Sequence, residues 1–306
     1  MQPEPALTTV TPEWRRLRER GGRFMTRVLL WIARNTSRSI TRALTLPPTV
    51  AWFIVTDAEA RRVSKRYLSR VLGREAGLAD VWHHIFTFAS VTLDRILMAL
   101  GGFTDLELVE DRDARERHVT YSSERGSLLF VSHLGSFEAL RVVGTGRARM
   151  KFLLDDEHHR KLTSLLGTLS PELAATIIPA AQPGPALALA IRQALDEGYR
   201  VGMMVDRPRA GEKTVRVPFF GADAAFPAGP WALAAALQAR VMLGFCVFRG
   251  GRTYEGHFEL FTEKFDLPRA HRAAGIEQAV RRYAARLEHH AKSAPYNWFN
   301  FYDFWK

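Results

Sequence analysis

Short apolar runs alternate with helical segments from residue 106 onward, and this alternation restricts the possible folds most strongly. Runs typical of strands occupy residues 106–110, 118–121, 128–132, 151–154, 176–178, 200–205, 240–248 and 254–261. Segments of helical spacing begin at residue 136 and cover residues 158–169, 185–197, 230–238 and 271–292. Such interleaving is typical of a sheet covered by helices on both faces. We therefore predict an α/β fold with a central mixed β-sheet flanked by helices.

The first hundred residues follow a different pattern. Residues 13–100 are predicted to be helical, with breaks at Pro47 and Pro48 and between Gly73 and Gly77. We expect a helical, amphipathic, membrane-associating region over residues 1–100. An α/β core over residues 101–306 would follow it within one continuous domain.

The formal net charge of +11 favours an anionic partner such as nucleic acid, an anionic membrane or an acidic protein. Many cations lie near the N-terminus, at Arg15, Arg16, Arg18, Arg20, Arg23, Arg27, Arg34, Arg38 and Arg42. Trp14, Phe24 and Trp31 lie among them, which is typical of a helix on an anionic membrane surface. The alternative is a solvated arginine face on a helix packed against the core. The apolar stretch 43–56 is short for a spanning helix and favours interfacial attachment.

Cys246 is the only cysteine, so we expect no internal disulfide and a reducing compartment. The first residues do not form a positively charged segment followed by an apolar one, so we expect no secretory signal peptide. Adjacent histidines occur at His83–His84, His158–His159 and His289–His290. Adjacent side chains point to different faces of a helix, so we predict no metal site. Glycine-rich nucleotide motifs are absent, and no cofactor is predicted.

A histidine and a carboxylate flank the turn after the apolar run 128–132. His133 ends the run, Ser136 suits a helix N-cap, and Glu138 falls in the first helical turn. A strand-to-helix turn places His133 at the carboxyl end of a strand, where open α/β sheets build their sites. Across such a turn Glu138 can hold the imidazole, as general-base chemistry on a hydroxyl requires. The alternative is a histidine that closes a strand and a helix glutamate favoured by the macrodipole.

A second charged group follows the strand predicted at residues 200–205. Asp206 and Arg207 stand at the carboxyl end of that strand, and Lys213 and Arg216 follow in the same loop. Three cations near a glycine-containing loop suit an anionic headgroup or phosphate. A solvated basic loop is the alternative. We expect this loop to continue to the helix at residues 230–238.

The chain ends in a dense aromatic run, with Tyr296, Trp298, Phe299, Phe301, Tyr302, Phe304 and Trp305. So many aromatic side chains favour a segment packed on the core or an interfacial belt, and core packing is the preferred interpretation. Base stacking does not fit, because basic residues are almost absent from the run.

Five sequence blocks, in this order, resemble the late lipid A acyltransferases, the lauroyl- and myristoyl-transferase-like enzymes of the lysophospholipid acyltransferase group. The blocks are His133–Glu138, Asp206–Arg207, Val217–Gly221, Phe226–Pro230 and Pro295–Trp305. The resemblance implies a glycerolipid-acyltransferase-like sheet. It also implies transfer of a fatty acyl chain from a thioester to a glycolipid hydroxyl at the cytoplasmic face of the bacterial inner membrane.

By this resemblance, His133 would be the general base for the acceptor hydroxyl, and Glu138 would orient it and stabilise its imidazolium form. The alkoxide would attack the thioester directly, without a covalent enzyme intermediate. The charged residues at positions 206, 207, 213 and 216 would bind substrate. The donor would be an acyl-carrier-protein or coenzyme A thioester, and an arginine-rich rim would steer an acidic carrier protein.

Alternatives concern both the acceptor and the class of protein. The loop Asp206-Arg207-Pro208-Arg209 looks closer to divergent members that act on other lipids or on polyene acceptors. Outside the family, the charge alone allows a non-catalytic basic protein that binds membranes or nucleic acid. No nucleic-acid-binding motif is found, so nucleic acid is not an expected partner. The expected partners are acyl carrier protein, anionic membrane lipids and a glycolipid acceptor.

Overall fold

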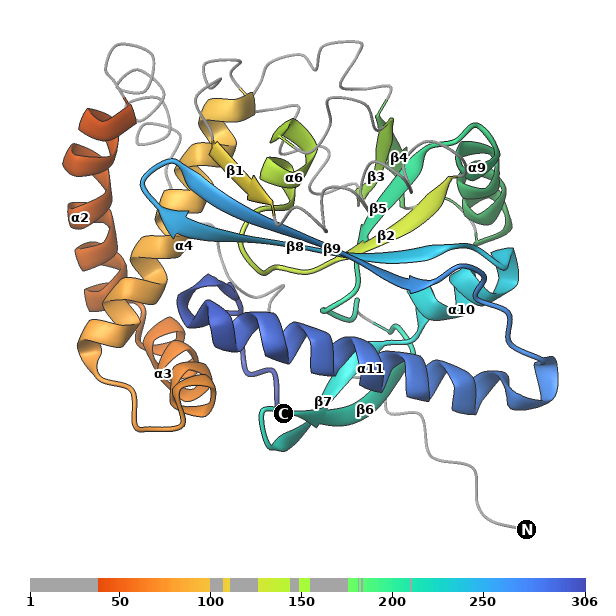
Figure 1. Cartoon of the computed structure of the whole chain (residues 1–306). Coiled ribbons are helices and arrows are strands. Elements are labelled where there is room, and N and C mark those ends of the chain that lie inside the picture. The colour runs from red at the N-terminus through yellow and green to blue at the C-terminus, as the bar shows by residue number, and fades with distance from the viewer. Residues whose placement is uncertain are drawn as a thin grey trace.

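The computed structural model describes residues 38–99, 107–110, 126–143, 149–154, 176–180, 182, 184–209 and 211–306. Within these residues the predicted α/β class is confirmed, with a sheet at the centre of the molecule and helices packed around it (Figure 1). The strand predicted at 118–121, the helix at 158–169 and the arginine-rich segment before residue 38 lie outside the described residues.

The described strands form a seven-stranded sheet in the order β1-β9-β8-β2-β5-β3-β4. They are β1 (Glu107–Glu110), β2 (Ser127–Val131), β3 (Met150–Leu154), β4 (Ile177–Pro179), β5 (Arg200–Met204), β8 (Val241–Gly250) and β9 (Thr253–Thr262). Paired neighbours run parallel except β8 and β9, which are antiparallel. The sheet is therefore mixed, as predicted, and β2 lies in its middle between β8 and β5.

Strand β2 is buried along its whole length, which explains its continuous apolar sequence. The sheet is accompanied by helices α6 (Phe137–Val143), α9 (Gly184–Asp196), α10 (Gly229–Leu237) and α11 (Arg272–Ser293). Leu128 and Phe130 join a hydrophobic cluster with side chains of α11. Leu129 and Val131 join a second cluster with side chains of α6. Because alternate residues of a strand point to opposite faces, each face of β2 has its own core.

The region between β5 and α10 corrects the prediction of a loop. It forms an antiparallel hairpin of β6 (Thr214–Phe219) and β7 (Ala222–Pro227), which packs against α11. Its two-residue turn has positive φ at Phe220 (48°) and Gly221 (75°). Two consecutive positive φ angles match the twist of a hairpin, but an aromatic residue is an uncommon choice there. Gly221 is therefore usual at the second position of this turn, but Phe220 before it hides the turn in the sequence.

Three of the described helices precede the sheet: α2 (Arg38–Thr56), α3 (Ala58–Leu72) and α4 (Leu78–Ala99). The break predicted at Pro47 and Pro48 is wrong, because α2 continues through both prolines. The two prolines leave the carbonyl groups of Ala43 and Leu44 without their helical donors. Ala43 and Leu44 are exposed, so water can donate hydrogen bonds to their carbonyl groups in place of the helix.

Helix α2 is attached to the body through Asp94 of α4, which is fully buried. Arg38 donates from Nε and Nη2 to the two carboxylate oxygens at 2.8 and 2.5 Å. The hydroxyl of Tyr254 in β9 donates to Asp94 Oδ2 at 2.7 Å. This network satisfies a buried carboxylate and connects α2, α4 and the sheet.

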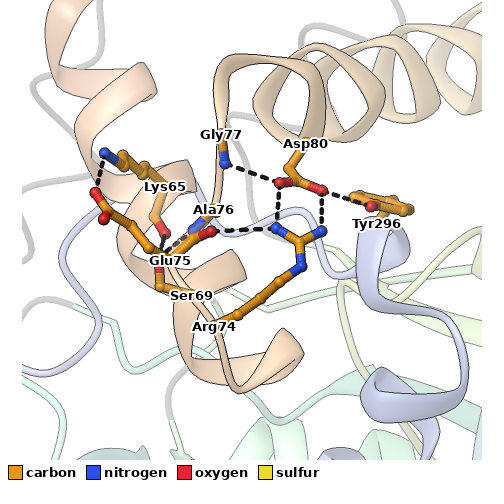
Figure 2. Close-up of polar contacts among 8 residues, drawn as sticks. All are labelled: Lys65, Ser69, Arg74, Glu75, Ala76, Gly77, Asp80 and Tyr296. Atoms are coloured by element: carbon orange, nitrogen blue, oxygen red, sulfur yellow. Dashed lines mark hydrogen bonds and ion pairs between the residues drawn. The ribbon is translucent and has the colours of Figure 1, made fainter.

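The C-terminal segment after α11 is packed on the core, as preferred from the sequence. Trp298 is fully buried, and Phe304 and Trp305 are almost so. Figure 2 shows where this segment meets the turn between α3 and α4. Asp80 accepts hydrogen bonds from both terminal nitrogens of Arg74 at 2.8 Å and from the hydroxyl of Tyr296 at 2.9 Å. The start of α4 is thereby held against the end of the chain.

Candidate active site

The candidate site lies at the carboxyl ends of β2 and β5. These strands pair in parallel, with Val131 opposite Met204, so the residues that follow them meet at one edge of the sheet. His133 follows β2 and Asp206 follows β5. His133 Nδ1 lies 2.8 Å from Asp206 Oδ1, and the backbone N–H of His133 donates to Asp206 Oδ2 at 3.0 Å. The fold thus brings together two sequence-predicted residues 73 positions apart.

Asp206 is fully buried and holds the imidazole in a fixed orientation. A third donor, the indole Nε1 of Trp298, reaches Asp206 Oδ2 at 3.1 Å. Burial raises the pKa of Asp206, but the charge and hydrogen bond of His133 and the charge of Arg207 outweigh it and lower this pKa to about 2. The carboxylate is therefore ionised near neutral pH and accepts from all three donors.

His133 remains partly accessible, with 27% of its side chain exposed. Burial lowers its pKa first, the nearby charge of Arg207 lowers it further, and Asp206 acts in the opposite direction. The net shift of the pKa is downward, so the imidazole is neutral near pH 7. A carboxylate oxygen can only accept, so Nδ1 carries the ring proton and Nε2 keeps its lone pair.

The turn from His133 to Ser136 is clamped between β8 and the C-terminal segment. The N–H of Phe299 donates to the carbonyl of His133 at 2.9 Å, and the N–H of Ser136 donates to the carbonyl of Cys246 at 2.9 Å. Gly135 has φ +66°, and a Cβ atom there would stand 1.7 Å from the Cys246 carbonyl oxygen. Only glycine fits this close backbone approach.

The position of Glu138 corrects one expectation about this turn. We expected its carboxylate to hold His133, but among the described residues that place is taken by Asp206. Glu138 forms an ion pair with Arg95 of α4 and accepts a hydrogen bond from the Ser136 hydroxyl at 3.2 Å. The reason is topological, because β5 ends beside β2 and its buried carboxylate reaches Nδ1 directly.

Of the other predicted binding residues, Arg207 lies beside the imidazole, and Lys213 and Arg216 lie at the β6–β7 hairpin. Arg207 lies at the site, where it donates to the carbonyl of Phe299 and its guanidinium stands 5.6 Å from the ring centre of Tyr302. Arg216 donates to the carbonyl of Asp223 at 3.0 Å, within the β6–β7 hairpin. Lys213 is exposed just before β6. Arg216 also donates to the carbonyl of Lys306 at 3.5 Å, so its hydrogen bonds join the hairpin and the end of the C-terminal segment rather than the imidazole.

Trp298 and Arg95 are site residues that the sequence did not single out. Trp298 was one of many aromatic residues in the terminal run, and only its hydrogen bond to Asp206 distinguishes it. Arg95 lies on α4, 43 positions before Glu138 in the sequence, and no local motif marks it. Within the described residues, no three metal-ligating side chains gather into a group that could hold a metal ion.

No described helix combines the length and apolar character required to cross a membrane. A search of curated proteins found no match to the chain. The family model for bacterial lipid A biosynthesis acyltransferases matches residues 11–306, which is nearly the whole sequence. The family resemblance predicted from the five sequence blocks is thereby confirmed. The chain belongs to the bacterial lipid A biosynthesis acyltransferase family.

Proposed function

We propose that this acyltransferase uses His133 as the general base that activates a lipid hydroxyl. The observation that carries the proposal is the 2.8 Å contact between His133 Nδ1 and the buried Asp206 carboxylate. This contact fixes the ring and its tautomer, and leaves Nε2 to accept a proton. A general base needs both a defined direction and a neutral ring, and the lowered pKa of His133 supplies the second condition.

The reaction would proceed by direct attack on the acyl donor. Nε2 of His133 takes the proton of the acceptor hydroxyl as its oxygen forms a bond to the thioester carbonyl carbon. The carbon–sulfur bond then breaks, and the imidazolium returns the proton to the leaving thiolate. Asp206 stabilises the imidazolium between these steps, which is the role of the carboxylate in a catalytic triad. No covalent acyl-enzyme is formed.

Glu138 contributes to this proposal as a second carboxylate of the site. Its side chain is 20% exposed, whereas the Asp206 side chain is fully buried. Its negative charge is balanced by the ion pair with Arg95. We assign the orientation of His133 to Asp206 and keep Glu138 as an accessible group at the start of α6, beside the substrates.

The donor in this proposal is an acyl-carrier-protein or coenzyme A thioester, and the acceptor is a lipid A-like glycolipid. The net charge of +11 supports an acidic carrier protein, since opposite charge accelerates encounter. Arg207 would bind anionic groups of the substrates near His133. The alternative acceptor within the family is another lipid or a polyene, suggested by the loop Asp206–Arg209.

The outer face of α2 supports attachment to the cytoplasmic surface of the inner membrane. Most large apolar side chains that are exposed among the described residues lie on α2 or at the start of α4: Ile40, Leu44, Trp52, Val55, Leu78 and Trp82. Exposed apolar and tryptophan side chains of this kind favour the boundary between lipid headgroups and acyl chains. Arg62 and Lys65 of α3 are also about half exposed, but each forms an ion pair with a carboxylate. The proposed attachment therefore rests on the exposed apolar side chains.

The proposal is tested by mass spectrometry of lipids from cells that carry the wild-type protein or His133→Ala. We expect a lipid that gains the mass of one acyl chain with the wild type and not with the variant. His271→Ala, which changes an exposed histidine at the start of α11, should behave as wild type. Full acylation by a folded His133→Ala protein would refute the assignment of His133 as the base.

A further inference from the structure

One face of helix α4 follows the C-terminal segment and ends at the active-site turn. His84, Phe88, Val91 and Arg95 are spaced by four, three and four positions, which places them on the same side of a helix. His84 Nε2 donates to the carbonyl of Trp298 at 2.9 Å. The ring centres of Phe88 and Phe299 are 5.3 Å apart. Arg95 is therefore the last residue of a stripe that faces the site.

The guanidinium of Arg95 reaches the first turn of α6. It forms an ion pair with Glu138 Oε1 and lies 5.7 Å from the ring centre of Phe137. The other carboxylate oxygen of Glu138 accepts from Ser136. Both sides of this carboxylate are thus engaged, one by a residue of its own turn and the other by a helix distant in sequence.

Arg95 belongs to the accessible side of the site. Its side chain is 40% exposed, compared with 20% for Glu138 and 27% for His133. Its charge also acts on His133, because it is one of the neighbouring cations that lower the pKa of that imidazole, after burial and Arg207. Arg95 is therefore close to both groups that face the substrates.

We propose that Arg95 is a positioning residue that holds Glu138 and neutralises its charge, so that His133 remains an unprotonated base. This inference rests on the proposed function of His133. Without Arg95, the site would lose a cation that lowers the pKa of His133, and Glu138 would lose its ion-pair partner. Both changes leave more uncompensated negative charge at the site, which favours the protonated ring. A protonated ring cannot accept the proton of the acceptor hydroxyl. The same loss would free the Glu138 side chain to leave its place at the start of α6.

The test is the pH dependence of kcat/KM for acyl transfer by Arg95→Ala, Arg95→Lys, Glu138→Gln and the double variant Arg95→Ala/Glu138→Gln. For Arg95→Ala we expect an acidic limb moved upward by about one pH unit, so that the loss is about threefold or less at pH 7 and grows toward about tenfold at pH values below the limb. Arg95→Lys keeps a cation and should hold the limb near its wild-type position. The double variant should recover part of the shift, because it also removes the carboxylate charge.

Arg281→Ala is the matched control, since it removes an exposed arginine from an ion pair with Glu277 on α11, away from the site. It should leave both the rate and the pH profile unchanged. Wild-type kcat/KM and an unmoved acidic limb in Arg95→Ala would overturn the inference. The same profile shift in Arg95→Lys and Arg95→Ala would also overturn it, because the charge would then have no role. Activity in His133→Ala would instead overturn the proposed function on which it rests.

Discussion

The active-site turn and the outer face of α2 differ in the surroundings of their side chains. At the site, the buried Asp206 carboxylate is bonded to His133 and to Trp298 of the C-terminal segment. Glu138 is paired with Arg95 of α4. On α2, large apolar side chains such as Trp52 and Val55 are 65% and 76% exposed. The first arrangement fixes a geometry, as catalysis requires. The α2 face leaves apolar side chains in water, and only a lipid surface or a partner protein could cover them.

The two regions should therefore respond differently to substitution. The site depends on long-range contacts that hold a few atoms in place, so small changes there should have large effects. The α2 face depends on the summed apolar area, so single changes there should have small effects on folding and moderate effects on membrane binding. Substitutions in the two regions should therefore differ in both the size and the kind of their effects.

Gly135→Ala should destabilise the fold more than any surface change. The new Cβ would stand 1.7 Å from the carbonyl oxygen of Cys246, and a backbone carbonyl cannot move aside as a flexible side chain can. We expect a loss of more than about 4 kcal/mol in the free energy of unfolding, measured with urea.

Gly73→Ala is the matched control for this change. Gly73 has nearly the same φ, +64°, but no atom lies within 4 Å of the position that a Cβ would take. It should cost only about 1–2 kcal/mol, the penalty of the left-handed conformation alone. Equal losses for the two variants would show that the close approach at Gly135 has no energetic consequence.

Acidification should weaken the contact between α4 and the C-terminal segment. His84 is fully buried between Ser64 and the Trp298 carbonyl, and burial is the main cause that lowers its pKa to about 4. The unfolded chain therefore binds this proton more readily than the folded one. Stability should fall as the pH drops below about 6.5, with a total loss from this group of about 3 kcal/mol once the pH reaches about 4.

Urea unfolding at pH 7 and at about pH 4.5 measures this loss, and His84→Gln isolates it. The variant lacks the titrating ring, so its stability should decrease less than that of the wild type over this interval. If the two proteins lose the same amount, His84 does not carry the predicted penalty, and other histidines account for the pH dependence.

Trp52→Ser combined with Val55→Ser should weaken binding to vesicles of anionic phospholipid by about tenfold or more, because two apolar side chains no longer enter the interface. The melting temperature should stay close to that of the wild type, since both side chains are exposed. Vesicle sedimentation at fixed salt concentration measures the affinity.

Leu189→Ser is the control for the α2 face. Leu189 is 69% exposed on α9, which makes its exposure similar to that of Trp52. It should bind vesicles as the wild type does. Equal weakening by both variants, or unchanged binding by the α2 variant, would show that α2 is not the membrane-facing surface.

Local sequence patterns predicted the sheet and the ends of its strands well. The apolar run at residues 128–132 and the helix start at Ser136 placed His133 on the correct edge, because both signals depend only on neighbouring residues. The strand at residues 200–205 placed Asp206 on an edge in the same way. Membership of the family followed from the order of five blocks rather than from any one of them.

The partner of His133 could not be predicted locally. Its choice depends on strand order, and the order β8-β2-β5 brings a carboxylate 73 residues away to Nδ1. The same limit applies to Arg95, whose contact with Glu138 joins α4 to α6. The β6–β7 hairpin was missed because Phe220 stands before Gly221 in its turn, where asparagine, aspartate or glycine is usual.

Asp206→Asn and Glu138→Gln, compared by kcat for acyl transfer with both proteins shown to be folded, separate the roles of the two carboxylates. If Asp206 orients His133 and stabilises its imidazolium, Asp206→Asn should lower kcat by roughly 10³–10⁴-fold, as the loss of such a carboxylate does in a triad. Glu138→Gln should lower kcat far less. A large loss in Glu138→Gln together with near wild-type kcat in Asp206→Asn would contradict the assignment of Asp206 as the partner of the catalytic base.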